Sequence, residues 1–380
     1  MIVFTLIGVW EQCKLGDLGS VAMNKRIFKE QTSESGDIPF YKIGTFGATA
    51  DAFISRELFE TYKKKYPYPK IGDLLISASG SIGRVVEYKG NDEYFQDSNI
   101  VWLKHDDRIN NLFLKQFYSI VKWHGLEGST IKRLYNKNIL ETTIHLPVFD
   151  EQEKIGTLFK QLDDIITLHQ RKLEQLKELK KAYLQAMFVP TNVQNNKVPK
   201  LRFANFEGNW ELCKLENVID KQIKGKVKVE NLCNGSVEYL DANRLNGGKP
   251  IYTKALPDVS ERDIIILWDG SKAGKVYYGF KGVLGSTLKA YQLKECANSQ
   301  FIYQQLLDNQ NNIYNNYRTP NIPHVVKNFS SIFPIWMTSF EEQSQMADIL
   351  SNLDNRIILQ QNLTDTMISL KKSYLQNMFI

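Results

Sequence analysis

The sequence predicts an α+β fold in which two globular mixed α/β domains are separated by two long antiparallel helices that form a coiled coil, with a pseudo-two-fold internal repeat. Two observations carry this prediction. A stretch of 40 residues occurs twice with the same helical pattern, and each copy follows a globular segment whose motifs also recur. At 380 residues the chain is too long for one ordinary core, which agrees with more than one domain.

The repeated stretch is Phe149–Phe188, which recurs 191 positions later as Phe340–Phe379. Sixteen of the 40 aligned residues are identical, and the alignment needs no gap. Both copies carry a Glu-Gln pair near the start and end on Lys-Lys-x-Tyr-Leu-Gln-x-Met-Phe. Two surface helices on one large domain are the alternative, but such helices have no reason to resemble each other.

Both copies are predicted to be helices because their apolar residues recur at alternating spacings of three and four, the pattern of a coiled-coil seam. Gly156 is the only glycine in either copy, and neither copy contains proline. At about 1.5 Å per residue, each helix spans on the order of 55 Å. The expected seam comprises Ile155, Leu158, Leu162, Ile165, Leu173, Leu176, Leu179, Tyr183 and Met187 in the first copy, and Met346, Ile349, Leu353, Ile357, Leu363, Met367, Leu370, Tyr374 and Met378 in the second.

Globular and helical parts are predicted to alternate along the chain. They are a first domain at 1–148, a helix at 149–188, a linker at 189–200, a second domain at 201–339 and a helix at 340–380. The linker is indicated by Pro190, Pro199 and three asparagines. Because this linker is short, the second domain must lie at the C-terminal end of the first helix. Helices that pack side by side with this connectivity must be antiparallel.

The globular segments repeat more faintly than the helices. Trp10-Glu-Gln-Cys-Lys-Leu15 matches Trp210-Glu-Leu-Cys-Lys-Leu215. Gly72–Gly83 matches Arg262–Gly274 with one residue inserted, through Asp-(Leu/Ile)-(Leu/Ile)-Ile…Gly-Ser…Gly. Between these motifs the two sequences diverge, so the domains are expected to share a fold and to differ in the residues between the motifs.

Composition limits the class of protein. A net charge of +6 permits a polyanionic partner without requiring one. No run approaches 18 apolar residues, so no transmembrane helix is predicted, and the apolar Met1–Trp10 is expected to be a buried strand because it lacks a basic start and a cleavage site. The four cysteines form no CxxC pair and fit free thiols in a reducing cytoplasm.

No catalytic or metal site is predicted. An amino-methyltransferase needs an Asn/Asp-Pro-Pro-aromatic loop to hold the flipped base, and no such motif occurs. Gly270–Lys275 resembles a phosphate-binding loop, but three residues instead of four lie between its glycines, and Val276 replaces the Ser or Thr that contacts magnesium. Pro257-Asp258 could begin a nuclease site, but no carboxylate-x-Lys follows it, and the five histidines have no metal-binding spacing.

These motifs, in this order, resemble the specificity subunit of a type I restriction–modification system. The resemblance rests on the two Trp-Glu-x-Cys-Lys-Leu segments, the two Gly-Ser turn signatures and the two Glu-Gln-initiated helices, and it covers nearly the whole chain. The start of the chain departs from the pattern. Leu201–Trp210 is typical of the family's domain openings, whereas Met1–Trp10 is not.

The resemblance implies a non-catalytic subunit that recognises DNA. Each globular domain is expected to be a target recognition domain that reads one half of a bipartite site in double-stranded DNA. The helices are expected to set the gap and to dock two modification (methyltransferase) subunits, which restriction subunits then join. S-adenosylmethionine, ATP and Mg are expected on those partners, and no cofactor on this chain. The alternatives are a stand-alone DNA-modifying or DNA-cleaving enzyme, and a coiled-coil scaffold without DNA specificity.

Candidate DNA contacts are basic, polar and aromatic residues in loops, because cations bind phosphates while amide and guanidinium groups read base edges. The loop before the last strand of each domain supplies Ser129, Thr130, Lys132, Arg133, Tyr135 and Asn136 in the first domain, and Arg318, Thr319, Asn321 and His324 in the second. The glycine turns supply Ser81, Arg84, Ser271, Lys272 and Lys275, since glycine allows close backbone approach. Ordinary hairpin chemistry is the alternative for these turns.

Two lysine runs are further candidates. The second domain has Lys221, Lys224, Lys226 and Lys228, and the first has Lys63–Lys65 beside two tyrosines and two prolines. A solvated face is the alternative for both runs.

The helical seam contains one polar position in each copy, His169 and Gln360, which are 191 residues apart. In an antiparallel pair the middles of the helices meet, so the two residues are expected to approach each other and to fix the register. The alternative is that both point outward. As spacers, the helices suggest a gap of about 5–8 base pairs between the half-sites, because sites on one face of a duplex recur every ~34–36 Å.

Overall fold

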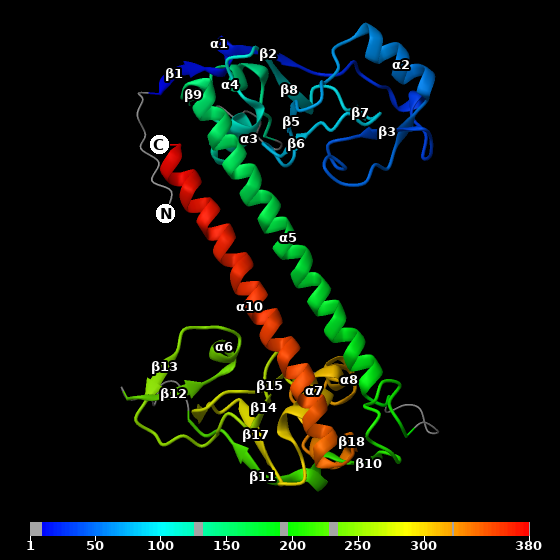
Figure 1. The fold of residues 1–380 in the computed structure, drawn as a ribbon, viewed down its shortest axis with the longest axis vertical. Coiled ribbons are helices and arrows are strands. Elements are labelled where there is room, and N and C mark those ends of the chain that lie inside the picture. Colours follow the sequence, from blue (N-terminus) through cyan, green and yellow to red (C-terminus); the bar gives the residue numbers. More distant parts are fainter. Residues whose placement is uncertain (1–9, 125–131, 191–196, 228–234, 321–322, 380) are drawn as a thin grey trace. The chain divides into compact units, whose positions relative to one another are not determined.

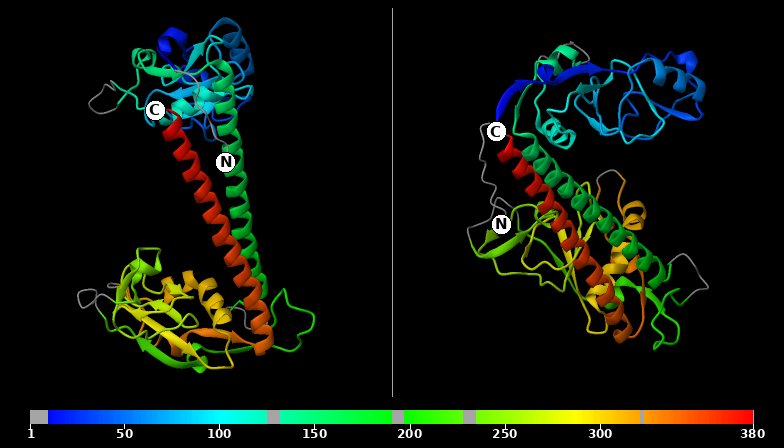
Figure 2. Two further views of the ribbon diagram at one scale, coloured as in Figure 1. Left: turned by 60° about the vertical axis from the view of Figure 1, so that its left-hand side comes forward. Right: turned by 45° about the horizontal axis from the view of Figure 1, so that its top comes forward.

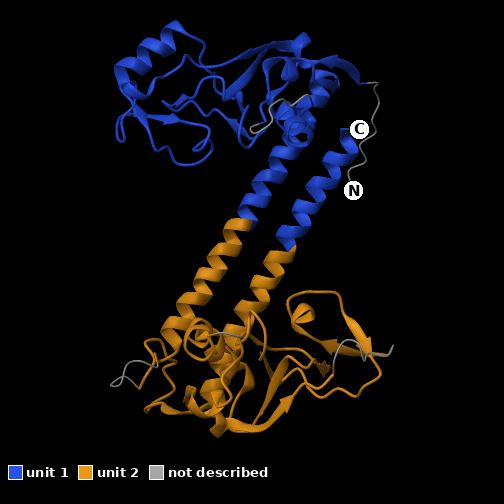
Figure 3. Cartoon of the chain, turned by 180° about the vertical axis from the view of Figure 1, so that it is seen from behind, with its two compact units in different colours: residues 1–169, 363–380 blue, residues 170–362 orange. Residues whose placement is uncertain are grey.

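The computed structural model describes residues 10–124, 132–190, 197–227, 235–320 and 323–379 (Figure 1). The chain divides into two compact units, shown in Figure 3. Unit 1 comprises residues 1–169 and 363–380, and unit 2 comprises residues 170–362. Each unit therefore contains one globular domain together with parts of both long helices.

The described part of unit 1 contains three small sheets. In the first, β1 (Glu11–Lys14) pairs antiparallel with β9 (Thr143–Leu146). The second is antiparallel and has the order β2 (Gly19–Ala22), β8 (Ile100–His105), β5 (Leu74–Ser77), β6 (Val85–Glu87). In the third, β3 (Ile38–Tyr41) lies between β4 (Phe53–Ile54) and the parallel β7 (Tyr94–Phe95). The helices are α1 (Leu15–Leu18), η1 (Lys29–Gln31), α2 (Arg56–Lys65), α3 (Asn111–Ile120) and α4 (Asn136–Leu140).

The described part of unit 2 has the same three sheets. Here β10 (Glu211–Lys214) pairs with β18 (Pro334–Met337). The four-stranded sheet has the order β11 (Ile219–Lys224), β17 (Leu288–Leu293), β14 (Ile264–Leu267), β15 (Val276–Tyr277). The third sheet contains β13 (Ile251–Thr253), β12 (Val237–Leu240) and the parallel β16 (Val283–Leu284). The helices are η2 (Leu215–Val218), α6 (Ala242–Leu245), α7 (Ser299–Asp308), α8 (Gln310–Asn316) and α9 (Phe329–Ile332).

The two globular domains share one topology, even where their sequences have diverged. Each sheet of unit 1 has a counterpart of the same strand order in unit 2, including the parallel pairs β3–β7 and β12–β16. The predicted α+β repeat is therefore confirmed at the level of sheet topology. Between β4 and β5 the first domain adds α2, which has no helical counterpart between β13 and β14.

The two long helices are α5 (Phe149–Met187) and α10 (Phe340–Met378), each of 39 residues. Within each unit they run side by side and antiparallel (Figure 2). In unit 1, Lys371 Nζ lies 2.6 Å from Asp163 Oδ1, and in unit 2, Lys180 Nζ lies 2.5 Å from Asp354 Oδ1. The members of these ion pairs are 191 residues apart in the repeat, so each unit holds the helices together with the same interaction. The predicted antiparallel arrangement is confirmed.

The buried face of the helices differs from the predicted seam. Ile165, Leu179, Leu363, Leu370 and Tyr374 are 37–42% exposed. The buried positions include Ile155, Leu162, Leu173, Leu176, Met187, Met346 and Leu353, which the predicted seam contains, and Phe159, Leu184, Ala347, Leu350, Thr364 and Leu375, which it does not. The prediction was wrong at those five positions because an α-helix has 3.6 residues per turn, so a stripe assigned with a 3.5-residue repeat drifts around a 39-residue helix.

The predicted approach of His169 to Gln360 stays a prediction, because His169 belongs to unit 1 and Gln360 to unit 2. Within its own unit, each residue is half-buried.

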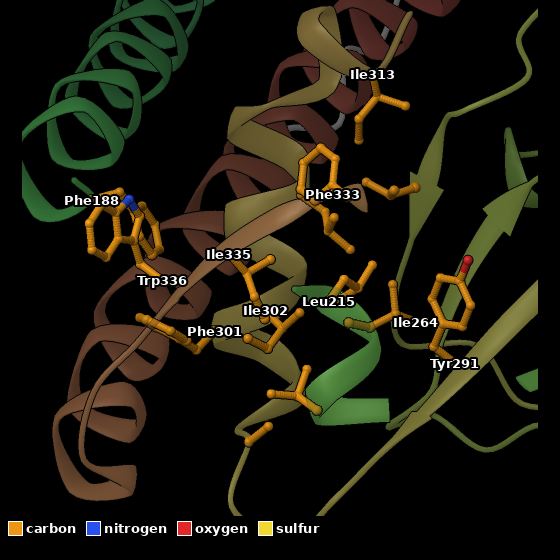
Figure 4. Close-up of a cluster of buried hydrophobic side chains, with 14 of the residues drawn as sticks. Phe188, Leu215, Ile264, Tyr291, Phe301, Ile302, Ile313, Phe333, Ile335 and Trp336 are labelled. Carbon is orange, nitrogen blue, oxygen red and sulfur yellow. The ribbon is translucent and has the colours of Figure 1, made fainter. Parts of the chain in front are cut away.

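The C-terminal end of each long helix completes the core of a globular domain. In unit 2, Phe188 packs against Trp210 and Phe301, with ring centroids 6.4 and 5.3 Å apart. In unit 1, Phe379 packs against Trp10 and Phe113 at 5.9 and 5.0 Å. Figure 4 shows part of the unit 2 core, with Phe188, Phe301 and Trp336 labelled. The end of α5 therefore completes the core of the second domain, and the end of α10 completes the core of the first domain.

A buried glutamine joins each globular domain to the helix that follows it. Gln152, 1% exposed, donates from Nε2 to the carbonyls of Arg108 and Pro147 and accepts from the Asn110 backbone at 2.9 Å. Gln343, 0% exposed, repeats this set of bonds in unit 2. This explains the glutamine of the Glu-Gln pair near the start of each repeat, because an amide side chain can donate two hydrogen bonds and accept another at one buried point.

Replacing Gln152 by Ala is expected to lower the free energy of unfolding of unit 1 by about 3 kcal/mol, since three backbone groups lose a hydrogen-bond partner that is itself buried. Urea unfolding of the variant measures this change. Gln161→Ala is the matched control, because Gln161 is exposed on the same helix. A change in Gln152→Ala no larger than in the control would show that the glutamine does not hold the domain to the helix.

Candidate nucleic-acid interface

In unit 1 the structure brings together the two loops that the sequence singled out. The backbone of Ser79, at the start of the glycine turn, forms a bridge with Arg133 in the loop before α4. Leu134 N donates to Ala78 O at 2.8 Å, which fixes this contact. The residues next to this contact, Lys132, Tyr135 and Asn136, are exposed. The Arg133 guanidinium lies 5.9 Å from the centre of the Tyr135 ring. Ser81 is exposed on the turn itself.

Unit 2 makes the same contact with different residues. Asp269 bridges to His324, and Val325 N donates to Trp268 O at 2.9 Å. Thr319 Oγ1 lies 3.0 Å from His324 Nδ1, so these two predicted residues contact each other. Ser271 and Lys272 are exposed on the adjoining turn. We call these two regions the loop clusters: residues 79–84 with 132–136 in unit 1, and residues 268–275 with 318–320 and 323–324 in unit 2.

Several predicted DNA-contacting cations are hydrogen-bonded within the protein. Arg84 Nη1 donates to Phe46 O at 2.7 Å, and Arg133 Nη2 donates to Ser98 O at 3.0 Å. Arg318 donates to the Tyr314 and Ser271 carbonyls, and Lys275 donates to the side chain of Asn246. Their first role is therefore to hold the loops in place. Sequence spacing could not reveal this, because most of the acceptors lie far away along the chain.

The second glycine of each turn is explained by packing within the protein. Gly83 and Gly274 have φ values of 82° and 92°, where other residues are strained. A Cβ added at Gly83 would lie 2.7 Å from Trp123 Nε1, and one added at Gly274 would lie 2.8 Å from Ile313 Cγ2. The close approach predicted for these glycines is to the domain's own side chains.

The predicted lysine run of the second domain does not form one face. Strand side chains alternate, so Lys221 and Lys224 lie on opposite faces of β11. Lys226 is exposed after the strand. In the first domain, Lys63 forms an ion pair with Asp92 at 3.4 Å and lies over Phe59, which favours a structural role there.

One cationic group was missed by sequence reasoning. Lys289 on β17 lies opposite Lys224, and its Nζ is 3.3 Å from the centroid of the Trp268 ring. Burial lowers the pKa of Lys289, the charge of Lys224 lowers it further, and Asp269 acts in the opposite direction. Val101 and Ala78 occupy the matching positions in unit 1. The pairing joins two strands that are distant in sequence, so no local pattern could have indicated it.

Four residues predicted to contact DNA lie outside the described residues: Ser129, Thr130, Asn321 and Lys228. Most of the Met1–Trp10 segment, which was expected to be a strand, also lies outside them.

Among the described residues, no group of His, Cys, Asp and Glu is arranged to hold a metal, and no helix has the length and apolar character needed to cross a membrane. Asp258, considered above as a nuclease residue, accepts from the Leu284 backbone at 2.9 Å and so connects a loop to β16.

The duplicated sheets, the two long helices and the repeated loop clusters define a tandem-repeat α+β protein with one candidate nucleic-acid surface in each repeat. A family model described as the type I restriction modification DNA specificity domain matches residues 8–178 and 207–367. The chain belongs to this family. Each matched region contains one globular domain and much of the helix that follows it.

Curated relatives cover part of the chain. A specificity subunit of a type I restriction enzyme from Haemophilus influenzae is 54% identical over 153 residues, 40% of each chain. The MjaVIII specificity subunit from Methanocaldococcus jannaschii is 32% identical over 180 residues, 45% of this chain and 42% of the relative. The chain thus spans less than half the length of these two relatives.

Solved structures extend the likeness of fold to the whole chain. The S subunit of a type I restriction–modification system from M. genitalium has a TM-score of 0.71 at 16% identity, covering 100% of this chain and 98% of that one. A chain from a study of complex assembly and conformational transition in a type I R-M system has a TM-score of 0.53 at 13% identity, with 99% of both chains covered.

Proposed function

We propose that this chain is the non-catalytic DNA-recognition subunit of a type I restriction–modification complex, in which each globular domain reads one half of a bipartite site. The observation that carries the proposal is the pair of loop clusters. They occupy the same topological position in both units and present different residues, Ser79 with Arg133 in one and Asp269 with His324 in the other. Two readers of different sequences require a shared frame and different contact residues.

The division of labour in each loop cluster follows from how its residues are held. Arg84, Arg133 and Arg318 anchor the loops through backbone carbonyls, so the exposed side chains start from a defined position. Exposed lysines such as Lys132 and Lys272 bind phosphates, which supplies affinity that does not depend on sequence. Tyr135, Asn136 and Thr319 supply apolar and hydrogen-bonding contacts to base edges.

The long helices connect the domains and supply docking surfaces for partner subunits. In unit 1 Leu168 is 66% exposed, and in unit 2 Ile358 and Leu359 are 58% and 61% exposed. Adjacent exposed apolar side chains such as Ile358 and Leu359 favour a surface that a partner covers. We assign this role to two modification subunits, with restriction subunits joining them in the cytoplasm. S-adenosylmethionine, ATP and Mg then belong to those partners, and this chain needs no cofactor.

Methylome sequencing tests this proposal. Cells that express the chain with its modification partner are expected to methylate a split motif with a gap of constant length. Purified chain incubated with S-adenosylmethionine and DNA is expected to transfer no methyl group, because the sequence lacks the Asn/Asp-Pro-Pro-aromatic loop that an amino-methyltransferase needs. A continuous motif in the cells, or reproducible methyl transfer by the purified chain alone, would contradict the proposal.

Lys289→Ala is expected to weaken DNA binding by the assembled complex about 3- to 10-fold and to reduce the salt dependence by about one counterion, as for loss of one phosphate contact. The Trp268 ring holds the Lys289 ammonium in place. A DNA phosphate would offset the free-energy cost of the partial burial of this charge. Titrations on cognate and scrambled duplexes at several salt concentrations measure both effects. Lys281→Ala is the control, since Lys281 is exposed between β15 and β16. Equal affinity of the Lys289 variant and the control would remove Lys289 from the interface.

A further inference from the structure

An ordered segment covers the meeting point of the two long helices in unit 2. It runs from Lys197 to Trp210, and Trp210 N donates to Lys197 O at 2.8 Å, which closes the segment into a loop. Leu201 N donates to Ala186 O near the end of α5 at 2.8 Å. The loop therefore lies against the end of α5 through its backbone as well as through its side chains.

Arg202 anchors this segment to the first turn of α10. Its Nε and Nη2 atoms lie 2.7 and 2.8 Å from the two oxygens of Glu342, a bidentate ion pair. The Glu342 side chain is 1% exposed and the Arg202 side chain is 13% exposed. Burial raises the pKa of Glu342, but the bonds from Arg202 and Thr338 outweigh it and lower the pKa overall. A carboxylate this buried is stable only with such a partner.

An apolar hollow of about 210 Å³ lies between this segment and the long helices of unit 2. The helices line it with Tyr183, Met187, Met346 and Ile349, and the segment contributes Leu201, Arg202 and Phe203. The pattern recognised here is an arginine followed directly by an aromatic residue. The arginine forms an ion pair with a carboxylate, and the aromatic ring lies beside apolar side chains of the helices.

Unit 1 keeps every helical component of this site. By the 191-residue repeat, Tyr183, Met187, Glu342, Met346 and Ile349 correspond to Tyr374, Met378, Glu151, Ile155 and Leu158. Each corresponding residue has the same chemical character. Tyr374 is 37% exposed and Met378 is partly exposed, whereas Met187 is 3% exposed. The unit 1 copy of the site is therefore the more open one.

At the positions of the sequence that match Arg202 and Phe203, unit 1 has no arginine. Aligning Trp10 with Trp210 places Ile2 and Val3 where unit 2 has Arg202 and Phe203, and Met1–Val9 contains no basic residue. Within the part of the chain that the structure describes, no cation forms an ion pair with Glu151. The acceptor side of the interaction has been retained without its donor.

We propose that Glu151, with Ile155, Leu158, Tyr374 and Met378, forms a docking site for an extended segment of another protein chain that carries an arginine followed by an aromatic residue. The guanidinium pairs with Glu151 as Arg202 pairs with Glu342, and the aromatic side chain covers the apolar residues. The neighbouring Asp150 is exposed and favours a cationic segment. This site is separate from the loop clusters, so it does not depend on how DNA is read.

A peptide with the sequence of residues 197–210 is the direct probe. A fluorescently labelled copy is titrated against the full-length chain, and anisotropy is expected to show saturable binding. Replacing the peptide's arginine by alanine, or Glu151 by Gln in the protein, is expected to weaken binding more than tenfold, as expected for loss of a bidentate ion pair. Glu153→Gln is the control, because Glu153 is an exposed acidic residue in the same turn of α5. Absence of saturable binding, or equal losses from Glu151→Gln and Glu153→Gln, would overturn the proposal.

A second variant tests the site from within the chain. Ile2→Arg combined with Val3→Phe supplies the missing pair in cis, and this variant is expected to lose at least tenfold in affinity for the labelled peptide, because the site is then filled. Adding Glu151→Gln to it is expected to remove the anchor of the new arginine. The double variant binding the peptide as well as the unmodified chain would show that the peptide binds elsewhere, and would also overturn the proposal. DNA affinity, measured in parallel, is expected to be unchanged in all these variants.

Discussion

Replacing residues 1–148 by the corresponding domain of a relative is expected to change one half of the methylated motif completely and to leave the other half unchanged. The physical reason is that each unit contains its own loop cluster and its own hydrophobic core, and the loop-anchoring bonds of Arg84, Arg133 and Arg318 all stay within one unit. Methylome sequencing of cells carrying the exchanged chain measures both half-sites at once.

The reciprocal exchange of residues 201–339 is the control, and it is expected to change only the opposite half. The exchange keeps Gln152 and Gln343, so each new domain must supply the carbonyl and amide groups that these glutamines bind. Simultaneous change of both half-sites in either exchange would show that the domains do not read independently, and the proposed division of labour would fail.

Ending the chain after Asn362 is expected to unfold the globular part of unit 1 while unit 2 remains folded. The truncation removes Leu375 and Phe379, which pack into the unit 1 core, and it removes the Lys371 partner of Asp163. Loss of a buried leucine and a core-lining phenylalanine costs on the order of 5–10 kcal/mol, comparable with the whole stability of a domain. The C-terminal helix thus belongs to the fold of the first domain, although the two are far apart in sequence.

Limited proteolysis followed by mass spectrometry measures this effect. Cleavage is expected throughout residues 10–148 of the truncated chain, whereas the part of unit 2 that precedes the truncation remains protected. Phe379→Ala gives a graded version of the same change, and Gln376→Ala is the control because Gln376 is exposed on the same helix. Equal protection of residues 10–148 in the truncated and intact chains would contradict the role given to the helix end.

The features predictable from the sequence are those encoded by local patterns or by the comparison of the chain with itself. The repeat of Phe149–Phe188 at Phe340–Phe379 indicated two long helices, and the matched Trp-Glu-x-Cys-Lys-Leu segments indicated two related domains. Continuous helix patterning and recurring motifs need no knowledge of which residues meet in space. For this reason the class of fold, the order of its parts and the family could all be inferred before the structure.

Tertiary structure decided which side chains meet. The sequence placed Leu179 in the seam, but packing buries Lys180 instead and pairs it with Asp354. Arg318 was predicted to contact DNA, and the fold directs its guanidinium to the Ser271 carbonyl 47 residues away. Trp268 and Lys289 are joined only because β14 and β17 pair. Such contacts depend on strand pairing, helix register and hydrogen bonds between residues distant in sequence, and a periodicity of three or four residues contains no information about them.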